Sequence, residues 1–195
     1  PAFGSGGELT AAEIDLVAKF LLEPPPAPPE LGLGEITESW KLIIPENKRP
    51  KKPEHTKNWQ NFFGIVLRDA GKVAILDGDT KELVSIVDTG FAVHILRSSA
   101  SGRYFYSIGR DGKATMIDLW MKKPGVVAEV KTCHDARSID SSKYKGPKGD
   151  FEDKLAIIGC YWPPQFAVLD GQTLEPKKLV STRSFTWDTN EYVNE

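Results

Sequence analysis

The stretch D-T-G-F-A-V-H-I-L-R, residues 88 to 97, places one histidine, His94, in an apolar run that ends at Ser98. On local sequence alone, a histidine with hydrophobic neighbours on a short strand is most often a satisfied core residue. A second stretch changes this interpretation. T-C-H-D-A-R-S-I, residues 132 to 139, echoes D-T-G-F-A-V-H-I and puts Arg137 where His94 stands. A repeat of about 40 to 50 residues with several short strands is typical of a β-propeller.

A second echo supports the first. L-R-D-A-G-K-V-A-I-L-D (67–77) matches G-R-D-G-K-A-T-M-I-D (109–118) and, more loosely, C-Y-W-P-P-Q-F-A-V-L-D (160–170). One hairpin position is thus occupied in three successive blades by Arg68, Arg110 and Tyr161. The sequence predicts a mainly β fold, with part of a β-propeller of about three blades.

Short apolar or alternating runs, broken by turn residues such as D-A-G, D-G-D, S-G and D-G, predict the strands of these blades. The predicted strands are 62–67, 72–77, 82–88, 91–97, 103–109, 113–119, 126–132, 136–141, 154–161, 165–170 and 177–183. The third blade carries an insertion, Y-K-G-P-K-G-D-F-E-D, at 144–153.

Corresponding positions in a propeller point the same way, because each blade is rotated about a common channel. His94 and Arg137 are expected near the start of an inner strand, and Arg68, Arg110 and Tyr161 at a hairpin. If both positions open on the same end of the channel, they form a ring of one imidazole, three guanidiniums and a phenol. Such a ring suits a planar, multiply anionic ligand with a metal at its centre.

At this point the chain resembles a known family, the cytochrome cd1 nitrite reductases. The resemblance covers nearly the whole chain. The stretches that carry it are L-R-D-A-G (67–71), D-T-G-F-A-V-H (88–94), S-A-S-G-R-Y (99–104), I-G-R-D (108–111), M-I-D-L-W (116–120), A-R-S-I (136–139), Y-W-P-P-Q-F (161–166) and L-E-P-K (174–177). It implies that the blades belong to an eight-bladed propeller that binds haem d1.

The resemblance also implies roles for the repeated residues. His94 would be the axial ligand of the haem d1 iron, Tyr161 would donate its hydroxyl to the cofactor, and the arginines would hold its carboxylates: Arg68, Arg110 and Arg137. No catalytic residue is expected within the chain, since the family's proton-delivering histidines come from later blades. From the residues alone, the arginines could instead form surface salt bridges with Asp69, Asp111 or Asp135, and Tyr161 could only pack.

The activity implied is dissimilatory reduction of nitrite to nitric oxide and water, with electrons that pass from haem c to haem d1 in the periplasm. The expected partners are nitrite and a small periplasmic electron donor such as a c-type cytochrome or a cupredoxin, and the protein is expected to be a homodimer. Two alternatives remain open. One is a haem d1 assembly or carrier protein, such as a dihydro-haem d1 dehydrogenase, and the other is a non-enzymatic propeller that serves as a binding platform.

Composition and charge exclude some classes of protein. The chain has 195 residues, is 40% hydrophobic and 27% charged, and carries a net charge of only -2. The chain has no excess of positive charge that would attract nucleic acid. It also has no apolar run long enough to span a membrane. His134 lacks enough neighbouring ligands for a metal site, and His55 is expected to be solvated. Cys133 and Cys160 are either free and buried or paired.

The first residues predict a separate unit. Thr10 and Glu13 form a capping box ahead of an apolar stripe that predicts a short helix within residues 1–22. By resemblance, this unit is the end of a cytochrome c domain, whose haem c attachment site would lie upstream of Pro1. The chain therefore reads as an internal fragment. Residues 23–61 are predicted to be a proline-rich linker and a connecting arm, with Trp40 and Trp59 as anchors, and residues 62–195 the first propeller blades.

Overall fold

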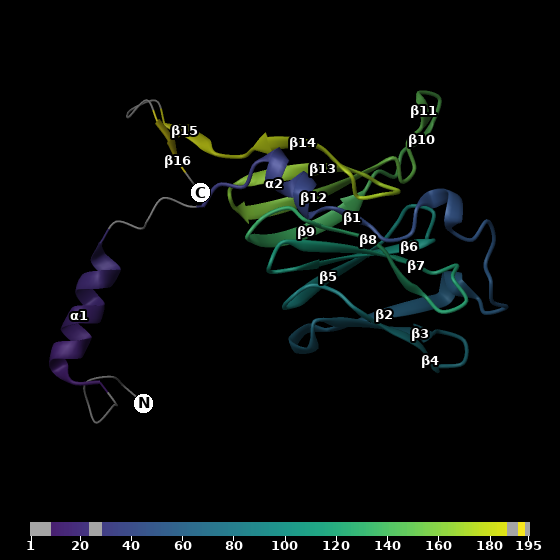
Figure 1. Ribbon diagram of the computed structural model, residues 1–195, viewed down its shortest axis with the longest axis horizontal. Coiled ribbons are helices and arrows are strands. Elements are labelled where there is room, and N and C mark those ends of the chain that lie inside the picture. The colour runs from purple at the N-terminus through teal and green to yellow at the C-terminus, as the bar shows by residue number, and fades with distance from the viewer. Residues whose placement is uncertain (1–8, 24–28, 187–190, 194–195) are drawn as a thin grey trace.

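The computed structural model describes residues 9–23, 29–186 and 191–193, which form mainly antiparallel β-sheet. Figure 1 shows three twisted sheets stacked side by side, in the order in which the chain builds them. We call them blades 1, 2 and 3. The predicted mainly β fold, part of a β-propeller, is confirmed, and the strands predicted within the blades are present with ends shifted by one or two residues.

Blade 1 has three strands, β2 (Phe62–Leu67), β3 (Lys72–Asp77) and β4 (Leu83–Asp88), paired in chain order. The hairpin between β2 and β3 contains a single 3₁₀ turn, η3 (Arg68–Ala70). It closes at Gly71, whose φ of 63° lies in the left-handed region that glycine adopts without steric cost.

Blades 2 and 3 each begin with an inner strand that pairs with the second strand of the same blade. Blade 2 has the strands β5 (Val93–Ser98), β6 (Tyr104–Gly109), β7 (Lys113–Asp118) and β8 (Gly125–Lys131), with β1 (Lys41–Leu42) added at the outer edge. Blade 3 has the strands β9 (Asp135–Ser141), β12 (Leu155–Trp162), β13 (Gln165–Asp170) and β14 (Pro176–Ser181).

Two small hairpins complete the described strands. The insertion at 144–153 forms β10 (Lys145–Gly146) and β11 (Gly149–Asp150), which project from blade 3 in Figure 1. Beyond β14, β15 (Ser184–Thr186) pairs with β16 (Glu191–Val193).

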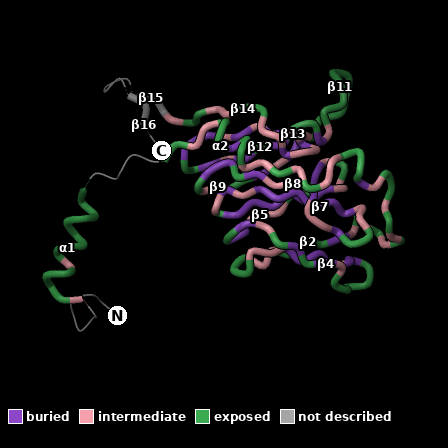
Figure 2. Tube along the Cα trace, in the orientation of Figure 1, coloured by how far each residue is buried: buried purple, intermediate pink, exposed green. Residues whose placement is uncertain are grey.

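The core lies between neighbouring blades. In Figure 2 the buried residues follow the middle of the stack. Alternation along a strand sets this pattern, since side chains of a strand point to opposite faces in turn: in β12, Ala156 and Ile158 are buried, whereas Ile157 is exposed. A fully buried Ile or Leu side chain contributes about 1.5–3 kcal/mol through removal of its surface from water.

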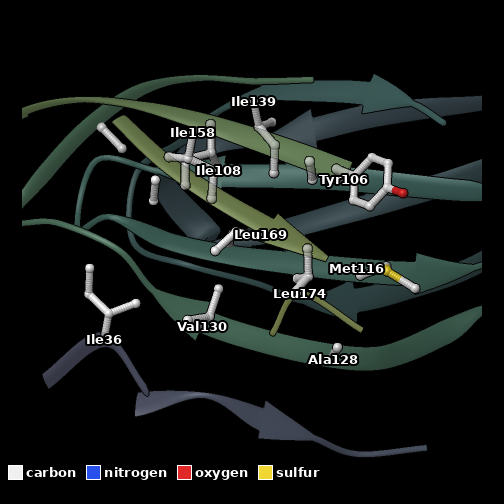
Figure 3. Close-up of a cluster of buried hydrophobic side chains, with 14 of the residues drawn as sticks. Ile36, Tyr106, Ile108, Met116, Ala128, Val130, Ile139, Ile158, Leu169 and Leu174 are labelled. Atoms are coloured by element: carbon white, nitrogen blue, oxygen red, sulfur yellow. The ribbon is translucent and has the colours of Figure 1, made fainter. Parts of the chain in front are cut away.

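One apolar cluster joins each pair of blades. Blades 1 and 2 share the cluster Phe62, Val73, Ile75, Val87, Val93, Phe105, Ile117 and Leu119. Blades 2 and 3 share a larger cluster, part of which Figure 3 shows, including Tyr106, Ile108, Met116, Ile139, Ile158, Leu169 and Leu174.

Residues 29–61 pack along the blades. The helix α2 (Leu33–Ser39) contacts β8 and β14 and buries Ile36 completely. The two predicted anchors make defined contacts: the indole Nε1 of Trp40 donates to the carbonyl of Thr173 at 2.9 Å, and the ring of Trp59 meets that of Trp120 edge-on at 5.7 Å. The 3₁₀ turn η1 (Glu46–Lys48) lies between these anchors, and the 3₁₀ turn η2 (Trp59–Asn61) begins at the second of them.

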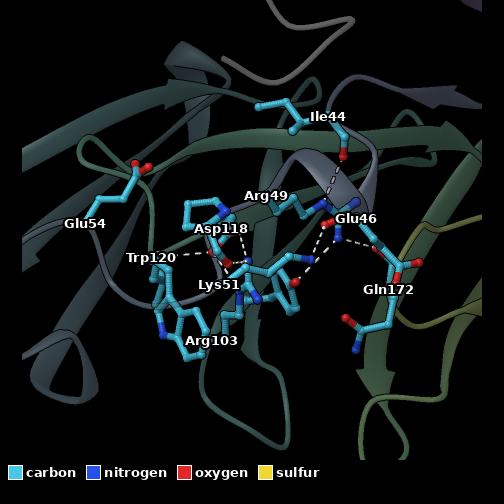
Figure 4. Close-up of polar contacts among 12 residues, drawn as sticks. Ile44, Glu46, Arg49, Lys51, Glu54, Arg103, Asp118, Trp120 and Gln172 are labelled. Atoms are coloured by element: carbon cyan, nitrogen blue, oxygen red, sulfur yellow. Dashed lines mark hydrogen bonds and ion pairs between the residues drawn. The ribbon is translucent and has the colours of Figure 1, made fainter.

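The expectation that His55 is solvated is wrong, and a second polar side chain of this arm, Arg49, is buried. Arg49 is only 3% exposed, and it donates to the carbonyls of Ile44 at 2.9 Å and Gln172 at 2.6 Å (Figure 4). His55 is half-buried, with its Nε2 2.8 Å from the carbonyl oxygen of Leu119. Backbone carbonyls of the arm itself and of the blades thus hold these two side chains.

Figure 4 also shows the guanidinium of Arg103, which lies at the end of blade 2 where β7 ends. Arg103 donates to both carboxylate oxygens of Asp118, at 3.0 and 2.6 Å, and its guanidinium lies 4.3 Å from the ring centre of Trp120. Asp118 is fully buried, so this bidentate pair satisfies a charge that would be costly alone. Arg103 also donates to the carbonyl of Pro50 at 3.0 Å, which fastens the arm to blade 2.

The predicted N-terminal helix is present as α1 (Ala11–Leu22), and its capping box forms as predicted, with the Thr10 amide donating to Glu13 at 2.7 Å. The helix buries no residue against the part of the chain that the structure describes, and Leu16 and Phe20 are largely exposed. Pro1 to Gly4 and most of the proline-rich segment lie outside the described residues. Among those described, no helix is both long and apolar enough to cross a membrane.

Candidate functional site at one end of the blades

The start of each inner strand and the hairpin that follows the second strand lie at the same end of a blade. In blade 2, Val93 at the start of β5 pairs with Gly109 at the end of β6. In blade 3, Asp135 at the start of β9 pairs with Trp162 at the end of β12. The five predicted site residues therefore share one end of the stack, and we call them the polar arc: Arg68, His94, Arg110, Arg137 and Tyr161.

His94 is the extra residue of a β-bulge. Val93 pairs with Gly109 and Ile95 with Ile108, so His94 has no partner on β6. A bulge changes the direction of the side chain that it leaves unpaired, and bulges often occur beside functional sites. Ala92, just before the strand, has φ of 47°, a left-handed value that is rare and strained for a residue with a β-carbon.

The imidazole of His94 is half-buried, and its two nitrogens differ. Nδ1 lies 3.3 Å from the carbonyl oxygen of Ala92. Nε2 is buried and has no hydrogen-bond partner within the described ranges. A buried polar atom without a partner costs about 1–3 kcal/mol. This nitrogen is therefore unlike that of a satisfied core histidine.

Arg137 and Tyr161 occupy a matching irregularity in blade 3. Between β9 and β12, Gly159 pairs with Ser138, Cys160 with Ala136 and Trp162 with Asp135. Arg137 on β9 and Tyr161 on β12 therefore have no partner on the opposite strand. The guanidinium carbon of Arg137 lies 5.4 Å from the centre of the Tyr161 ring, within cation–π range. A pocket of about 290 Å³ opens beside the pair, lined also by Gly159, Gln165 and Phe166.

Arg110 links blade 2 to blade 3. Its Nη2 donates to Oδ2 of Asp135 at 3.0 Å, and this hydrogen bond, followed by charge attraction, raises the pKa of the Arg110 guanidinium. The salt-bridge interpretation thus holds for Asp135. Asp111 instead accepts from the backbone N–H of Phe91 at 2.9 Å. It fixes the turn ahead of the His94 bulge.

Arg68 lies in η3, on the hairpin of blade 1, and η3 contacts β5 of blade 2. Its guanidinium donates to the adjacent Asp69 at 2.9 Å, and both side chains are more than half exposed. Such an exposed pair contributes about 0–1 kcal/mol. Arg68 can therefore change partner at little cost.

The cysteines form a disulfide, Cys133 to Cys160, which resolves the choice that sequence left open. His134 is exposed, and its backbone N–H donates to the carbonyl of Trp162 at 2.7 Å. No cluster of three or more His, Cys, Asp or Glu side chains with metal-site geometry occurs in the part of the chain that the structure describes. The buried Nε2 of His94, which has no partner among the described residues, makes this residue a candidate metal ligand.

Sequence analysis missed two features of the site. The bulges at His94, Arg137 and Tyr161 are set by pairing across strands and carry no local signal beyond a polar residue inside an apolar run. Asp135 was considered only as a competing salt-bridge partner. In the structure its Oδ1 is buried and accepts no hydrogen bond from the described residues, while Oδ2 holds Arg110.

Comparison with known proteins connects this geometry to a family. The chain is 49% identical over 180 residues to a nitrite reductase of Stutzerimonas stutzeri, a match that covers 92% of this chain and 31% of the relative. It is 29% identical over 178 residues to a dihydro-heme d1 dehydrogenase of Pseudomonas aeruginosa, covering 91% of this chain and 34% of the relative. The chain thus spans about a third of the length of these relatives.

A solved structure supports the same relationship. A dihydro-heme d1 dehydrogenase in complex with DHE superimposes with a TM-score of 0.73 at 27% identity, over 93% of this chain and 37% of that one. The family model of the cytochrome D1 heme domain matches residues 57–193. This range contains the three blades and every residue of the polar arc. The resemblance drawn from the repeated motifs is confirmed: the chain belongs to the cytochrome D1 heme domain family.

Proposed function

We propose that this chain supplies part of the haem d1 site of a nitrite reductase that reduces nitrite to nitric oxide, with His94 as the axial ligand of the iron. The observation that carries the proposal is the buried Nε2 of His94, which sits on a bulge and lacks a partner among the described residues. The 49% identity to a nitrite reductase supports this activity over others of the family.

The state of the imidazole fits a ligand role. If Nδ1 carries the proton and donates to the carbonyl of Ala92, Nε2 keeps a lone pair, and neutral imidazole is the form that binds metals. Because Nε2 is covered by its neighbours, binding at this atom requires the ring or its cover to move. The bulge leaves the backbone of His94 outside the strand ladder, which makes such a movement inexpensive.

The guanidiniums fit the carboxylates of a macrocycle. Arg137 forms no ion pair within the described residues, and Arg110 is held by one carboxylate oxygen of Asp135 only. Charge-assisted, forked hydrogen bonds from arginine are the strongest that a protein offers a carboxylate. Arg68 can exchange Asp69 for a cofactor carboxylate, since both partners are exposed.

Haem d1, when bound, supplies the one-electron reduction of nitrite to nitric oxide and water. The residues of this chain would hold and orient that group: His94 would bind its iron, the arginines would bind its carboxylates and Tyr161 would donate its hydroxyl. We propose that the electron arrives through haem c on a domain that α1 completes, and that later blades deliver protons.

The proposal extends to the setting of the enzyme. We propose a periplasmic homodimer that receives electrons from a c-type cytochrome or a cupredoxin. The Cys133–Cys160 disulfide supports the compartment, because such bonds form and persist in oxidising environments such as the bacterial periplasm.

A second function is favoured by a specific observation. The match to the dihydro-heme d1 dehydrogenase structure covers 93% of the chain, so the same blades serve a protein of different chemistry. A role in haem d1 assembly would keep the polar arc and differ in residues of later blades. Sequencing of those blades separates the two, since the proposed reductase requires proton-delivering histidines there.

The axial-ligand assignment is tested by titrating haem d1 into the cofactor-free, full-length protein and recording its absorption. His94→Ala should remove or strongly weaken binding while the circular dichroism of the blades is unchanged. His134→Ala is the matched control, because His134 is exposed at the same end of blade 3. Equal binding by the wild type and the His94 variant would show that another residue holds the iron.

A further inference from the structure

The Cys133–Cys160 disulfide lies directly beneath the polar arc. Cys133 is in the link between β8 and β9, and Cys160 is in β12, so the bond ties the connection between blades 2 and 3 to the second strand of blade 3. Both side chains are buried, Cys133 completely. The bond is thus part of the interior at the end of the blades that carries the site.

On one side, the disulfide fixes the irregularity that presents Arg137 and Tyr161. Cys160 pairs with Ala136, and this single pair stands between the two residues that the ladder passes over. A pair isolated in this way has few ladder hydrogen bonds to hold it. The covalent link to Cys133 keeps Cys160, and with it the adjacent Tyr161, in place.

On the other side, the disulfide supports the hairpin that carries Arg110. A β-carbon at Gly112 would lie 1.9 Å from the carbonyl oxygen of Cys133, so the hairpin sits directly on the backbone of this cysteine. The backbone N–H of Thr132 donates to the carbonyl of Gly112 at 2.9 Å. Asp135, two residues after Cys133, holds the Arg110 guanidinium.

We infer that the Cys133–Cys160 disulfide is a positioning element of the cofactor site, which sets Arg110, Arg137 and Tyr161 relative to one another. The inference rests on the proposed function. Groups that are fixed before binding lose less conformational freedom when the ligand arrives, and this raises affinity. Without the bond, the two segments can shift independently, and the affinity for haem d1 should fall about three- to tenfold, as expected for one or two side chains that must be ordered on binding.

The test compares the cofactor-free, full-length wild type with Cys133→Ala/Cys160→Ala by titration with haem d1, reading the dissociation constant and the absorption spectrum. Leu119→Ala is the control. This buried residue follows β7 at the opposite end of blade 2, so its loss lowers stability without touching the arc. The disulfide variant should bind more weakly, and the Leu119 variant should bind like the wild type.

A second substitution separates positioning from general stability. Tyr161→Phe should weaken binding in the wild type and should weaken it less in the background that lacks the disulfide, because there the hydroxyl is no longer held in place. Equal effects in the two backgrounds would overturn the inference. If the double cysteine variant does not fold, the wild type is reduced, freed of reductant, titrated and then reoxidised. The affinity for haem d1 should fall on reduction and return on reoxidation. An affinity that does not change on reduction would overturn the inference.

The titrations distinguish an error in the proposed function from an error in the role inferred for the disulfide. A wild type that does not bind haem d1 overturns the proposed function together with this inference. A wild type and a disulfide-free variant that bind equally well leave the proposed function intact and overturn the inference alone.

Discussion

The guanidinium of Arg137 stacks over the ring of Tyr161 at 5.4 Å, and each residue is left unpaired by one of two adjacent register shifts between β9 and β12. The two side chains come from neighbouring strands of blade 3. A regular ladder would pair both residues with partners across the sheet. Here the irregularity leaves them free to face each other at the end of the blade.

The Arg137–Tyr161 stack should matter more for cofactor binding than for folding. Tyr161→Ala should lower the free energy of unfolding by only about 0.5–1 kcal/mol, the usual contribution of an exposed cation–π pair, and should weaken haem d1 binding. Tyr161→Phe keeps the stack and isolates the hydroxyl. Denaturant unfolding and haem d1 titration of both variants make the comparison. A large loss of stability in the alanine variant, with unchanged binding, would assign the pair a structural role only.

Gly112 is the tightest point beneath Arg110. Its φ of 74° is left-handed, and a β-carbon would lie 1.9 Å from the carbonyl oxygen of Cys133. Gly112→Ala should therefore lower the free energy of unfolding by about 2 kcal/mol or more, since strain and overpacking add.

Gly34 offers the matched control. It lies in α2, and a β-carbon there meets nothing within 4 Å. Gly34→Ala should leave stability unchanged or raise it by up to about 1 kcal/mol through helix propensity. Urea unfolding of the two alanine variants checks both statements, and a tolerated Gly112→Ala would mean that the hairpin can move away from Cys133.

The repeat was visible in the sequence because blades 1 and 2 reuse the same hairpin chemistry. R-D-A-G follows β2 and R-D-G follows β6, and this recurrence placed Arg68 and Arg110 at equivalent positions. The capping box at Thr10 is likewise local, since its partners are three residues apart. The hairpins and the capping box depend on neighbours along the chain, and both are present as predicted.

Three features could not be predicted from the sequence because they depend on contacts between residues far apart in the chain. Arg49 lies in a run of lysines and prolines, yet it is buried because Ile44 and Gln172 offer it backbone carbonyls from opposite sides. The bulge at His94 depends on the register of β6. Cys133 and Cys160 are 27 residues apart in the sequence, and their Cα atoms lie 6.0 Å apart because β9, which follows Cys133, pairs with β12, which contains Cys160.

Arg49 gives a stability test at the other end of the molecule from the arc. Arg49→Ala should lower the free energy of unfolding by about 2–4 kcal/mol, because it removes charge-assisted hydrogen bonds and leaves buried carbonyls unpaired. Haem d1 affinity should not change. The neighbouring Lys51 is exposed, and Lys51→Ala should stay within about 0.5 kcal/mol of the wild type. An Arg49 variant as stable as the wild type would show that water replaces the guanidinium.

The last prediction concerns acid stability. Asp77 is 2% exposed, and its carboxylate accepts from Lys57 at 2.9 Å and from the backbone N–H of Asp79 at 3.0 Å. The hydrogen bond from Lys57 is the main cause that lowers the pKa of Asp77 from 3.8 to about 2. A carboxyl group whose pKa is lower in the folded state binds its proton more readily when unfolded, so folding is favoured while the group is ionised.

This contribution is fully present above about pH 4 and is lost as the pH falls from 4 towards 2. Asp77→Asn should thus lower stability at pH 6, and the difference from the wild type should shrink between pH 4 and pH 2. Lys57→Met should produce the same narrowing, because it removes the main cause of the lowered pKa. Urea unfolding at pH 6, 4 and 2.5 measures the trend. A constant difference across this range would mean that the Asp77 carboxylate is no better stabilised in the folded protein than in the unfolded chain.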